Sequence, residues 1–294
     1  MEFFNTRDAL QTALDMRRLT GQRIGLVPTM GNLHEGHLTL VDEARKRCGY
    51  VLATIFINPL QFGPGEDLAN YPRTLEEDLE KLASRGCDAV FVPPDHEMYP
   101  NGLDNLTLVT VPGLSERHCG KSRPGHFSGV CTVVSKLFNL TQPDAAFFGE
   151  KDYQQLQIIR KMAGDLCFPL DIIGVPTVRL PSGLAMSSRN GYLDESQLLK
   201  AATLYQCLQI AADRMQQGDR QYGKIEQAAC SRLEQAGFIV DYFNISHADT
   251  LEPATDKDRQ LVILAAARLG PTRLIDNIRC SLPVASVSIA TGME

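Results

Sequence analysis

The sequence lacks the features of a membrane protein or a nucleic-acid binder. Its longest unbroken apolar run, LVILAAA at residues 261–267, is far shorter than the roughly 20 residues of a membrane-spanning helix. Acidic residues number 35 and basic ones 29, whereas a protein that grips a phosphate backbone carries a basic face. We therefore expect no membrane and no nucleic-acid partner, while one small anion still fits a local basic pocket.

Secretion signals and paired cysteines are also missing. The start, MEFFNTRDAL, has acidic residues and no basic region before an apolar stretch, so we expect no signal peptide. The eight cysteines are scattered without a CxxC pair, which indicates reduced, mostly buried thiols in a cytosol-like compartment. With 294 residues, 44% of them hydrophobic, the chain is long enough for one large domain or two smaller ones. We expect a cytoplasmic location.

Short apolar strands alternate with amphipathic helical patterns up to residue 176. The predicted strands are residues 23–30, 50–57, 88–94, 145–149 and 170–176. The helical patterns between them are residues 37–47, 74–86, 130–142 and 151–166. This alternation predicts an α/β fold, a Rossmann-like doubly wound parallel sheet with helices on both faces.

The pattern changes after residue 178. The segment VRLPSGLAMSSRNGYLD (178–194) has the Gly, Pro and Ser content of a hairpin or exposed loop. It is followed by helical patterns at 195–217 and 225–235 and by strands at 238–248, 259–270 and 272–280. We predict a Rossmann-like domain at residues 1–178 and a smaller C-terminal α+β domain at residues 179–294.

Polar motifs follow four of the predicted strands, where open parallel sheets bind their ligands. They are PTMGNLHEGH (28–37), INPLQFGPG (57–65), FGEKD (148–152) and VPTVRLPSGLAMSSRN (175–190). The first admits three interpretations. A metal site is disfavoured because HEGH is one residue shorter than HExxH and has no third ligand nearby. Ordinary packing of the two histidines is the second. The third is nucleotide handling, because a glycine-rich turn entering a helix offers free N–H groups to phosphate.

Two other motifs suit an anion. Lys151 would stand in the first turn of a helix, where the dipole disfavours cations, unless an anionic ligand shares the site. MSSRN (186–190) offers two hydroxyls and a guanidinium, groups that bind a triphosphate well. SERHCGKS (115–122) is not a P-loop, because Ser115 replaces the first glycine and SRPG follows instead of a helix. Lys121 and Arg123 there belong to a solvated basic turn or contact an anion.

The motifs taken together resemble a known family. HEGH resembles the HxGH signature of the class I aminoacyl-tRNA synthetase and nucleotidylyltransferase superfamily, and MSSRN resembles its KMSKS counterpart, with Ala185 in place of the leading lysine. With FINPLQF, YPRTLEEDL, SRPGHFSGV and FGEKDYQQ in this order, the chain resembles the pantoate–β-alanine ligase family from end to end. The resemblance implies that Lys151 contributes to phosphate binding, the role of the lysine that Ala185 replaces.

The resemblance implies an AMP-forming carbon–nitrogen ligase of coenzyme A biosynthesis, active as a homodimer. It also implies that residues 1–178 form the ATP- and pantoate-binding domain and that residues 179–294 form a lid over the site. The carboxylate of (R)-pantoate would attack the α-phosphorus of ATP, giving pantoyl adenylate and pyrophosphate. β-Alanine would then displace AMP to form pantothenate. Mg²⁺ would arrive with ATP rather than at a metal site of the protein.

The resemblance also implies roles for individual residues. His37, His34 and Lys151 would be catalytic, with His37 as the proton donor. Gln61 and Gln155 would hold pantoate and β-alanine. The ATP site would comprise Met30, Gly31, Asn32, Leu33, His34, Glu35, Gly36, His37, Gly149, Glu150, Lys151, Asp152, Val178, Met186, Ser187, Ser188 and Arg189.

Two rival functions fit part of the pattern. A nucleotidylyltransferase that adenylates a phosphate would keep HEGH but would have little need of NPLQF and paired glutamines. A metal-binding module without catalytic activity would use His34 and His37 as ligands.

Overall fold

The computed structural model describes residues 1–282. Its contacts divide the chain into two compact units, Met1–Leu199 and Lys200–Glu294. This division lies later than the expected boundary at 178/179. The loop after residue 178 is tied to the first unit, for example through the ion pair of Arg189 Nη2 with Asp67 Oδ1 at 3.0 Å. The lid function of the C-terminal part stays a prediction.

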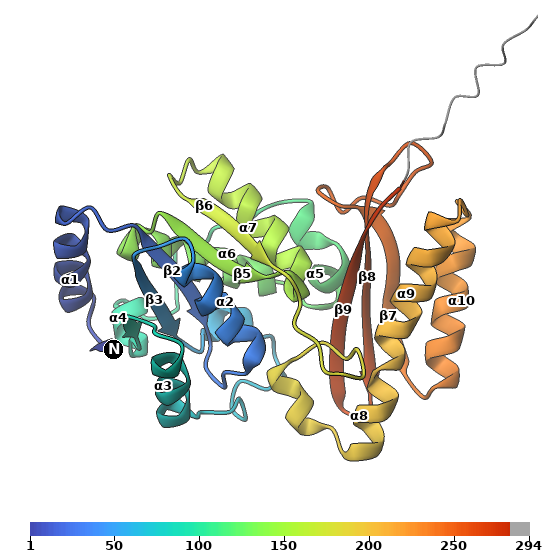
Figure 1. The fold of residues 1–294 in the computed structure, drawn as a ribbon, viewed down its shortest axis with the longest axis horizontal. Helices are drawn as coiled ribbons and strands as arrows, with labels where there is room; N and C mark the ends of the chain where they lie inside the picture. Colours follow the sequence, from blue (N-terminus) through green and yellow to red (C-terminus); the bar gives the residue numbers. More distant parts are fainter. Residues whose placement is uncertain (283–294) are drawn as a thin grey trace, which may run out of the picture. The chain divides into compact units, whose positions relative to one another are not determined.

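Six parallel strands form the sheet of the first unit, in the order β1-β4-β3-β2-β5-β6. Figure 1 labels β3, β2, β5 and β6 of this sheet. The strands are β1 (Glu2–Phe4), β2 (Ile24–Thr29), β3 (Tyr50–Ile55), β4 (Ala89–Phe91), β5 (Ala145–Gly149) and β6 (Asp171–Val175). The order reverses at β2, because β3 pairs on one side of it and β5 on the other. The predicted doubly wound α/β sheet is confirmed. The sequence pattern missed only β1 among these strands, because its three residues are exposed or half-buried, whereas the equally short β4 is fully buried and lies in an apolar run.

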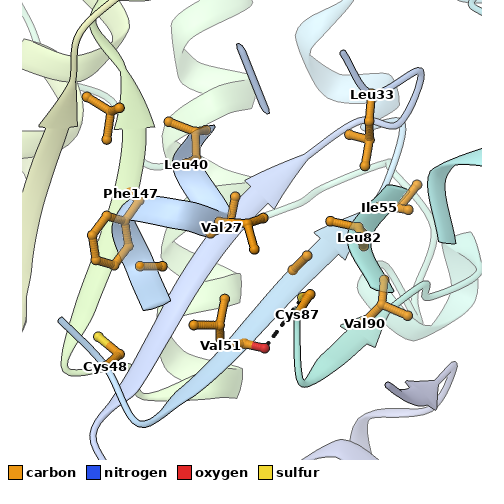
Figure 2. Close-up of a cluster of buried hydrophobic side chains, with 14 of the residues drawn as sticks. Val27, Leu33, Leu40, Cys48, Val51, Ile55, Leu82, Cys87, Val90 and Phe147 are labelled. Atoms are coloured by element: carbon orange, nitrogen blue, oxygen red, sulfur yellow. Dashed lines mark hydrogen bonds between the residues drawn. The ribbon is translucent and has the colours of Figure 1, made fainter. Parts of the chain in front are cut away.

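Helices connect these strands and bury them. They are α1 (Arg7–Leu19), α2 (Glu35–Arg45), α3 (Leu75–Ser84), α4 (Asp95–Met98), α5 (His118–Ser122), α6 (His126–Thr141) and α7 (Tyr153–Asp165), with the short turns η1 (Pro59–Gln61), η2 (Leu114–Glu116), η3 (Glu150–Asp152) and η4 (Ser188–Tyr192). Figure 2 shows strand residues Val27, Val51 and Phe147 with Leu40 of α2 and Leu82 of α3 in one buried cluster. The strands read as apolar runs because their residues are buried on both sides of the sheet.

The second unit is a three-stranded antiparallel sheet with two helices. Helix α8 (Glu195–Ala201) spans the division, and α9 (Thr203–Gln216) and α10 (Tyr222–Gln235) follow. The sheet has the order β7-β8-β9, from β7 (Ile239–His247), β8 (Gln260–Leu269) and β9 (Thr272–Ser281). This is the predicted α+β architecture, although the single helix expected at 195–217 is divided at Ala202. Among residues 1–282, every helix is too short or too polar to cross a bilayer.

Candidate active site

A cavity lies at the carboxyl edge of the first sheet, where the strand order reverses. Its walls come from the four segments that follow β2, β3, β5 and β6, together with α6. Parallel strands end at the same edge, so the loops that leave them converge there. The four motifs singled out in the sequence therefore meet around one space, and all their lining residues belong to the first unit.

The structure places most of the predicted site residues on the walls of this cavity. These are Met30, His34, Gly36, His37, Gln61, Gly149, Lys151, Asp152, Gln155, Val178, Met186, Ser187, Ser188 and Arg189. Gly31, Asn32, Leu33, Glu35 and Glu150 are not among the lining residues. Leu33 is 3% exposed in the core, and the Glu35 carboxylate pairs with Arg85. The Glu150 carboxylate lies beside Gly174 of β6.

The two histidines of HEGH lie against each other at the start of α2. Their ring centroids are 4.1 Å apart. His34 is the N-cap of the helix, and its Nδ1 accepts the backbone N–H of Gly36 at 3.1 Å. The Nδ1 of His37 accepts the backbone N–H of His34 at 3.4 Å. Backbone N–H groups only donate, so both Nδ1 atoms are unprotonated and each neutral ring carries its hydrogen on Nε2. Each ring therefore has one N–H left to donate.

Both rings are held neutral near pH 7. Burial lowers the pKa of His37 to about 3, helped by His34 and Lys151. Burial also lowers the pKa of His34 to about 4, and the positive charge of Lys151 adds to the effect. Such rings offer uncharged hydrogen-bond donors beside the positive end of a helix, an arrangement suited to an anion.

Gly36 lies against the side chain of His34. In the structure, a Cβ at this position would lie 2.9 Å from Cε1 of His34. The glycine thus makes room for the folded-back imidazole of its own motif.

A buried carboxylate to which no sequence motif pointed holds the turn before HEGH. Asp78 of α3 is 1% exposed. It accepts the backbone N–H groups of Asn32 at 2.8 Å and Leu33 at 2.7 Å, and the hydroxyl of Thr74 at 3.2 Å. Asn32 has a φ of 51°, a left-handed conformation that costs an ordinary residue energy and here is stabilised by this carboxylate. The motif YPRTLEEDL contains Asp78, but nothing in its spacing distinguishes it from Glu76 or Glu77.

A second group of residues surrounds Gln61, which also lines the cavity. Arg123 makes a two-point ion pair with Glu66, both contacts at 2.6 Å. Its Nη1 also lies 2.9 Å from Nε2 of His126, whose Nδ1 lies 2.7 Å from the carbonyl oxygen of Gln61. Because arginine only donates and a carbonyl only accepts, His126 carries its hydrogen on Nδ1. Arg123 therefore belongs to a built network and not to a solvated turn.

Two titratable neighbours of Arg123 in this network, Glu66 and His126, have lowered pKa values. Hydrogen bonding to Arg123 holds the pKa of Glu66 at about 2. Burial, helped by Arg123, lowers the pKa of His126 to about 4. The motif SRPGHFSGV contains His126, but its residue pattern assigns this histidine no role, and only the approach of α6 to η1 reveals one.

The cavity is lined by several hydrogen-bond donors. Lys151, Ser187 and Ser188 line it, together with Arg123 and Arg189, whose guanidinium groups are ion-paired with Glu66 and Asp67. Across residues 1–282, no group of three or more His, Cys, Asp or Glu side chains is placed to hold a metal ion. The site is thus built to bind a polyanion by side-chain and helix-end donors.

A doubly wound sheet with an HEGH turn and a polyanion site at its carboxyl edge defines the class of protein, an α/β enzyme fold of the nucleotide-handling type. Comparison with known proteins identifies the family within that class. A model of the family described as pantoate-beta-alanine ligase matches residues 2–279. The chain belongs to this family, and the resemblance predicted from its motifs is confirmed.

Individual members of the family match this chain over nearly the whole length of both proteins. The pantothenate synthetase of Hahella chejuensis is 55% identical over 273 residues, 93% of this chain and 96% of that protein. The crystal structure of pantothenate synthetase from Thermus thermophilus matches with a TM-score of 0.89 at 45% identity, covering 95% of this chain and 99% of the other. A Francisella tularensis pantoate-beta-alanine ligase, solved with beta-gamma ATP and beta-alanine, matches with a TM-score of 0.80 at 33% identity, covering 95% and 97%.

Proposed function

We propose that this chain joins pantoate to β-alanine to form pantothenate, using ATP and passing through pantoyl adenylate. Membership of the ligase family supports the overall reaction, and the nucleotide and β-alanine in the Francisella tularensis structure support the two co-substrates. The observation that carries the proposal is the single cavity that brings the HEGH pair, Lys151 and two glutamines together.

The triphosphate would lie along the histidines, Lys151 and the MSSRN segment. The carboxylate of pantoate attacks the α-phosphorus, the phosphoanhydride bond breaks, and pyrophosphate carries away the electron pair. The substrate brings its own nucleophile, so the protein aligns the reactants and stabilises charge on the transferring phosphate. The His34 and His37 rings supply neutral Nε2–H donors for this task. We therefore propose His37 as a hydrogen-bond donor to phosphate rather than as the source of a free proton.

Pantoate would occupy the part of the cavity between Gln61 and Gln155. The amides bind its hydroxyl and carboxylate oxygens, and Met30, Val130 and Val134 offer apolar surface to its two methyl groups. In the second step the neutral amine of β-alanine attacks the acyl carbon of the adenylate, the bond between the acyl carbon and the phosphate oxygen breaks, AMP leaves with the electron pair, and the nitrogen releases one proton to solvent as the amide forms. Gln61 and Gln155 are proposed to hold the acid throughout both steps.

The remaining features follow from the family resemblance. We propose that Mg²⁺ enters bound to the triphosphate, since this ion keeps its waters and prefers phosphate oxygens. The predicted ATP-site residues that do not line the cavity would hold the shape of the loops around it. They are Gly31, Asn32, Leu33, Glu35 and Glu150. The cytoplasmic location and the lid function of residues 179–294 are further proposals. We also propose a homodimer, which light scattering of the purified protein tests directly.

The deciding experiment measures pyrophosphate release and pantothenate formation separately. With MgATP alone little pyrophosphate should appear, and adding (R)-pantoate should trigger its release. AMP and pantothenate should then depend on β-alanine. Release triggered by a phosphorylated substrate and not by pantoate would identify the rival nucleotidylyltransferase. Stoichiometric zinc in the purified protein, together with no pantoate-dependent turnover, would favour the metal-binding module.

A further inference from the structure

A buried amide at the cavity wall is hydrogen-bonded to Gln61. Asn58, in the turn after β3, is 1% exposed. Its Oδ1 accepts the hydroxyl of Tyr99 at 2.6 Å and the backbone N–H of Leu60 at 3.3 Å. Its Nδ2 donates to the carbonyl oxygen of Gly129 at 3.1 Å and to Oε1 of Gln61 at 3.1 Å. Both hydrogens and both lone pairs of this amide are therefore used.

These partners determine which end of the Gln61 amide points to the cavity. The Gly129 carbonyl only accepts, so it must face the nitrogen of Asn58. The second hydrogen on that nitrogen then requires an acceptor, which is Oε1 of Gln61. The nitrogen of Gln61 is left on the cavity side, where it lies 3.0 Å from the thioether sulfur of Met30, a weak acceptor. Gln61 thus presents N–H groups to a ligand, a polarity suited to a carboxylate or hydroxyl oxygen.

Tyr99 supplies the shortest of the four contacts to Asn58 while lying outside the cavity wall. It follows α4 directly and is 3% exposed. Burial and the charge of Asp95 raise the pKa of its phenol, so the hydroxyl keeps its hydrogen and acts as a donor. The competing donor to the same oxygen, the Leu60 N–H at 3.3 Å, is longer and weaker.

We propose that Tyr99 is a positioning residue for the pantoate subsite, holding Asn58 so that Asn58 sets the orientation of the Gln61 amide. This rests on the proposed function, in which Gln61 binds pantoate. Removing the hydroxyl leaves a lone pair of Asn58 buried without its main donor. The Asn58 side-chain amide then rotates more freely, and the Gln61 side-chain amide no longer has one favoured orientation. A carboxylate oxygen would meet the carbonyl end of Gln61 in part of the population.

Tyr99→Phe tests this with almost no change of side-chain shape. We expect the KM for pantoate to rise about tenfold, the effect of one lost hydrogen bond to a charged ligand, with the KM values for ATP and β-alanine unchanged. Tyr153→Phe is the matched control, because Tyr153 is equally buried at 2% exposed and its hydroxyl accepts from Gln157 at 2.8 Å. A Tyr99→Phe enzyme whose KM for pantoate equals that of the control overturns the inference.

A second measurement separates this inference from the proposed function. Side-chain amide signals of Asn58 and Gln61 are recorded by ¹⁵N NMR in the ligand-free protein and assigned with Asn58→Asp and Gln61→Glu variants. Tyr99→Phe should shift both signals, whereas Tyr153→Phe should shift neither. Unshifted signals in Tyr99→Phe overturn the positioning role even if turnover falls. Absence of pantoate-dependent turnover in the unmodified protein would overturn the proposed function, and with it the assignment of this subsite to pantoate, while the signals still decide the role of Tyr99.

Discussion

Lowering the pH from 7 to 5 should destabilise the folded chain through His37. The pKa of this side chain is about 3 in the folded protein and near 6.5 when it is exposed to water. Between pH 3 and pH 6.5, His37 is protonated in the unfolded chain and stays neutral in the folded chain. Stability from this residue is therefore fully present above pH 6.5 and is lost as the pH falls toward 3.

The size of the effect follows from the pKa difference. Each pH unit below 6.5 costs about 1.4 kcal/mol, so at pH 5 the free energy of unfolding should have fallen by at most about 2 kcal/mol through His37. His34 and His126, each with a pKa of about 4, add losses of the same sign over the same interval. The carboxylate of Glu66 adds little there, because its pKa lies at about 2 and its ordinary value below 5.

Urea unfolding at pH 7, 6 and 5 measures this loss. The His37→Gln variant keeps a neutral polar side chain but cannot titrate, so its stability should fall by about 2 kcal/mol less than that of the unmodified protein. His96→Gln is the control, because His96 is exposed on α4 away from the cavity. It should follow the unmodified protein. Equal pH dependence in His37→Gln and the unmodified protein would refute the reasoning.

Three substitutions test the remaining assignments. His37→Ala should slow adenylate formation at least about 100-fold while circular dichroism stays native; an unchanged rate removes His37 from the chemistry. Gln155→Ala should mainly raise the KM for pantoate, and a defect confined to ATP would contradict its role. Asp78→Asn replaces an acceptor of two backbone N–H groups and should lower the free energy of unfolding by about 1–3 kcal/mol and raise the KM for ATP. Unfolding curves and ATP titrations that match the unmodified protein would show that the turn does not depend on this carboxylate.

Much of the fold was predictable because its strands are buried on both faces. β2, β3 and β5 read as short apolar runs, and the amphipathic patterns between them mark α2 and α7. The convergence of four motifs on one cavity was also predictable, since parallel strands deliver their following loops to the same edge. That rule needs only the order of elements along the chain.

The supporting contacts of the site could not be predicted in the same way. Asp78 reaches the turn of Asn32 only because α3 packs beside α2. Gly129 is needed because a Cβ there would lie 2.2 Å from the carbonyl oxygen of Leu60. Contacts of this kind depend on how two segments that are distant in the sequence pack together in space. Neither segment contains a local residue pattern that predicts its contact with the other.

The strand order has a consequence for how the chain is synthesised. β2 lies in the middle of the sheet, yet β5, its partner on one side, is synthesised much later. For example, the backbone N–H of Ile24 at the start of β2 donates to the carboxylate of Asp144, 120 residues further along the chain. While the ribosome makes the intervening residues, that edge of β2 stays unpaired because β5 has not yet been made. A nascent chain stopped before β5 would therefore hold the HEGH turn but no substrate cavity. Such a chain also exposes a strand edge that a chaperone can recognise.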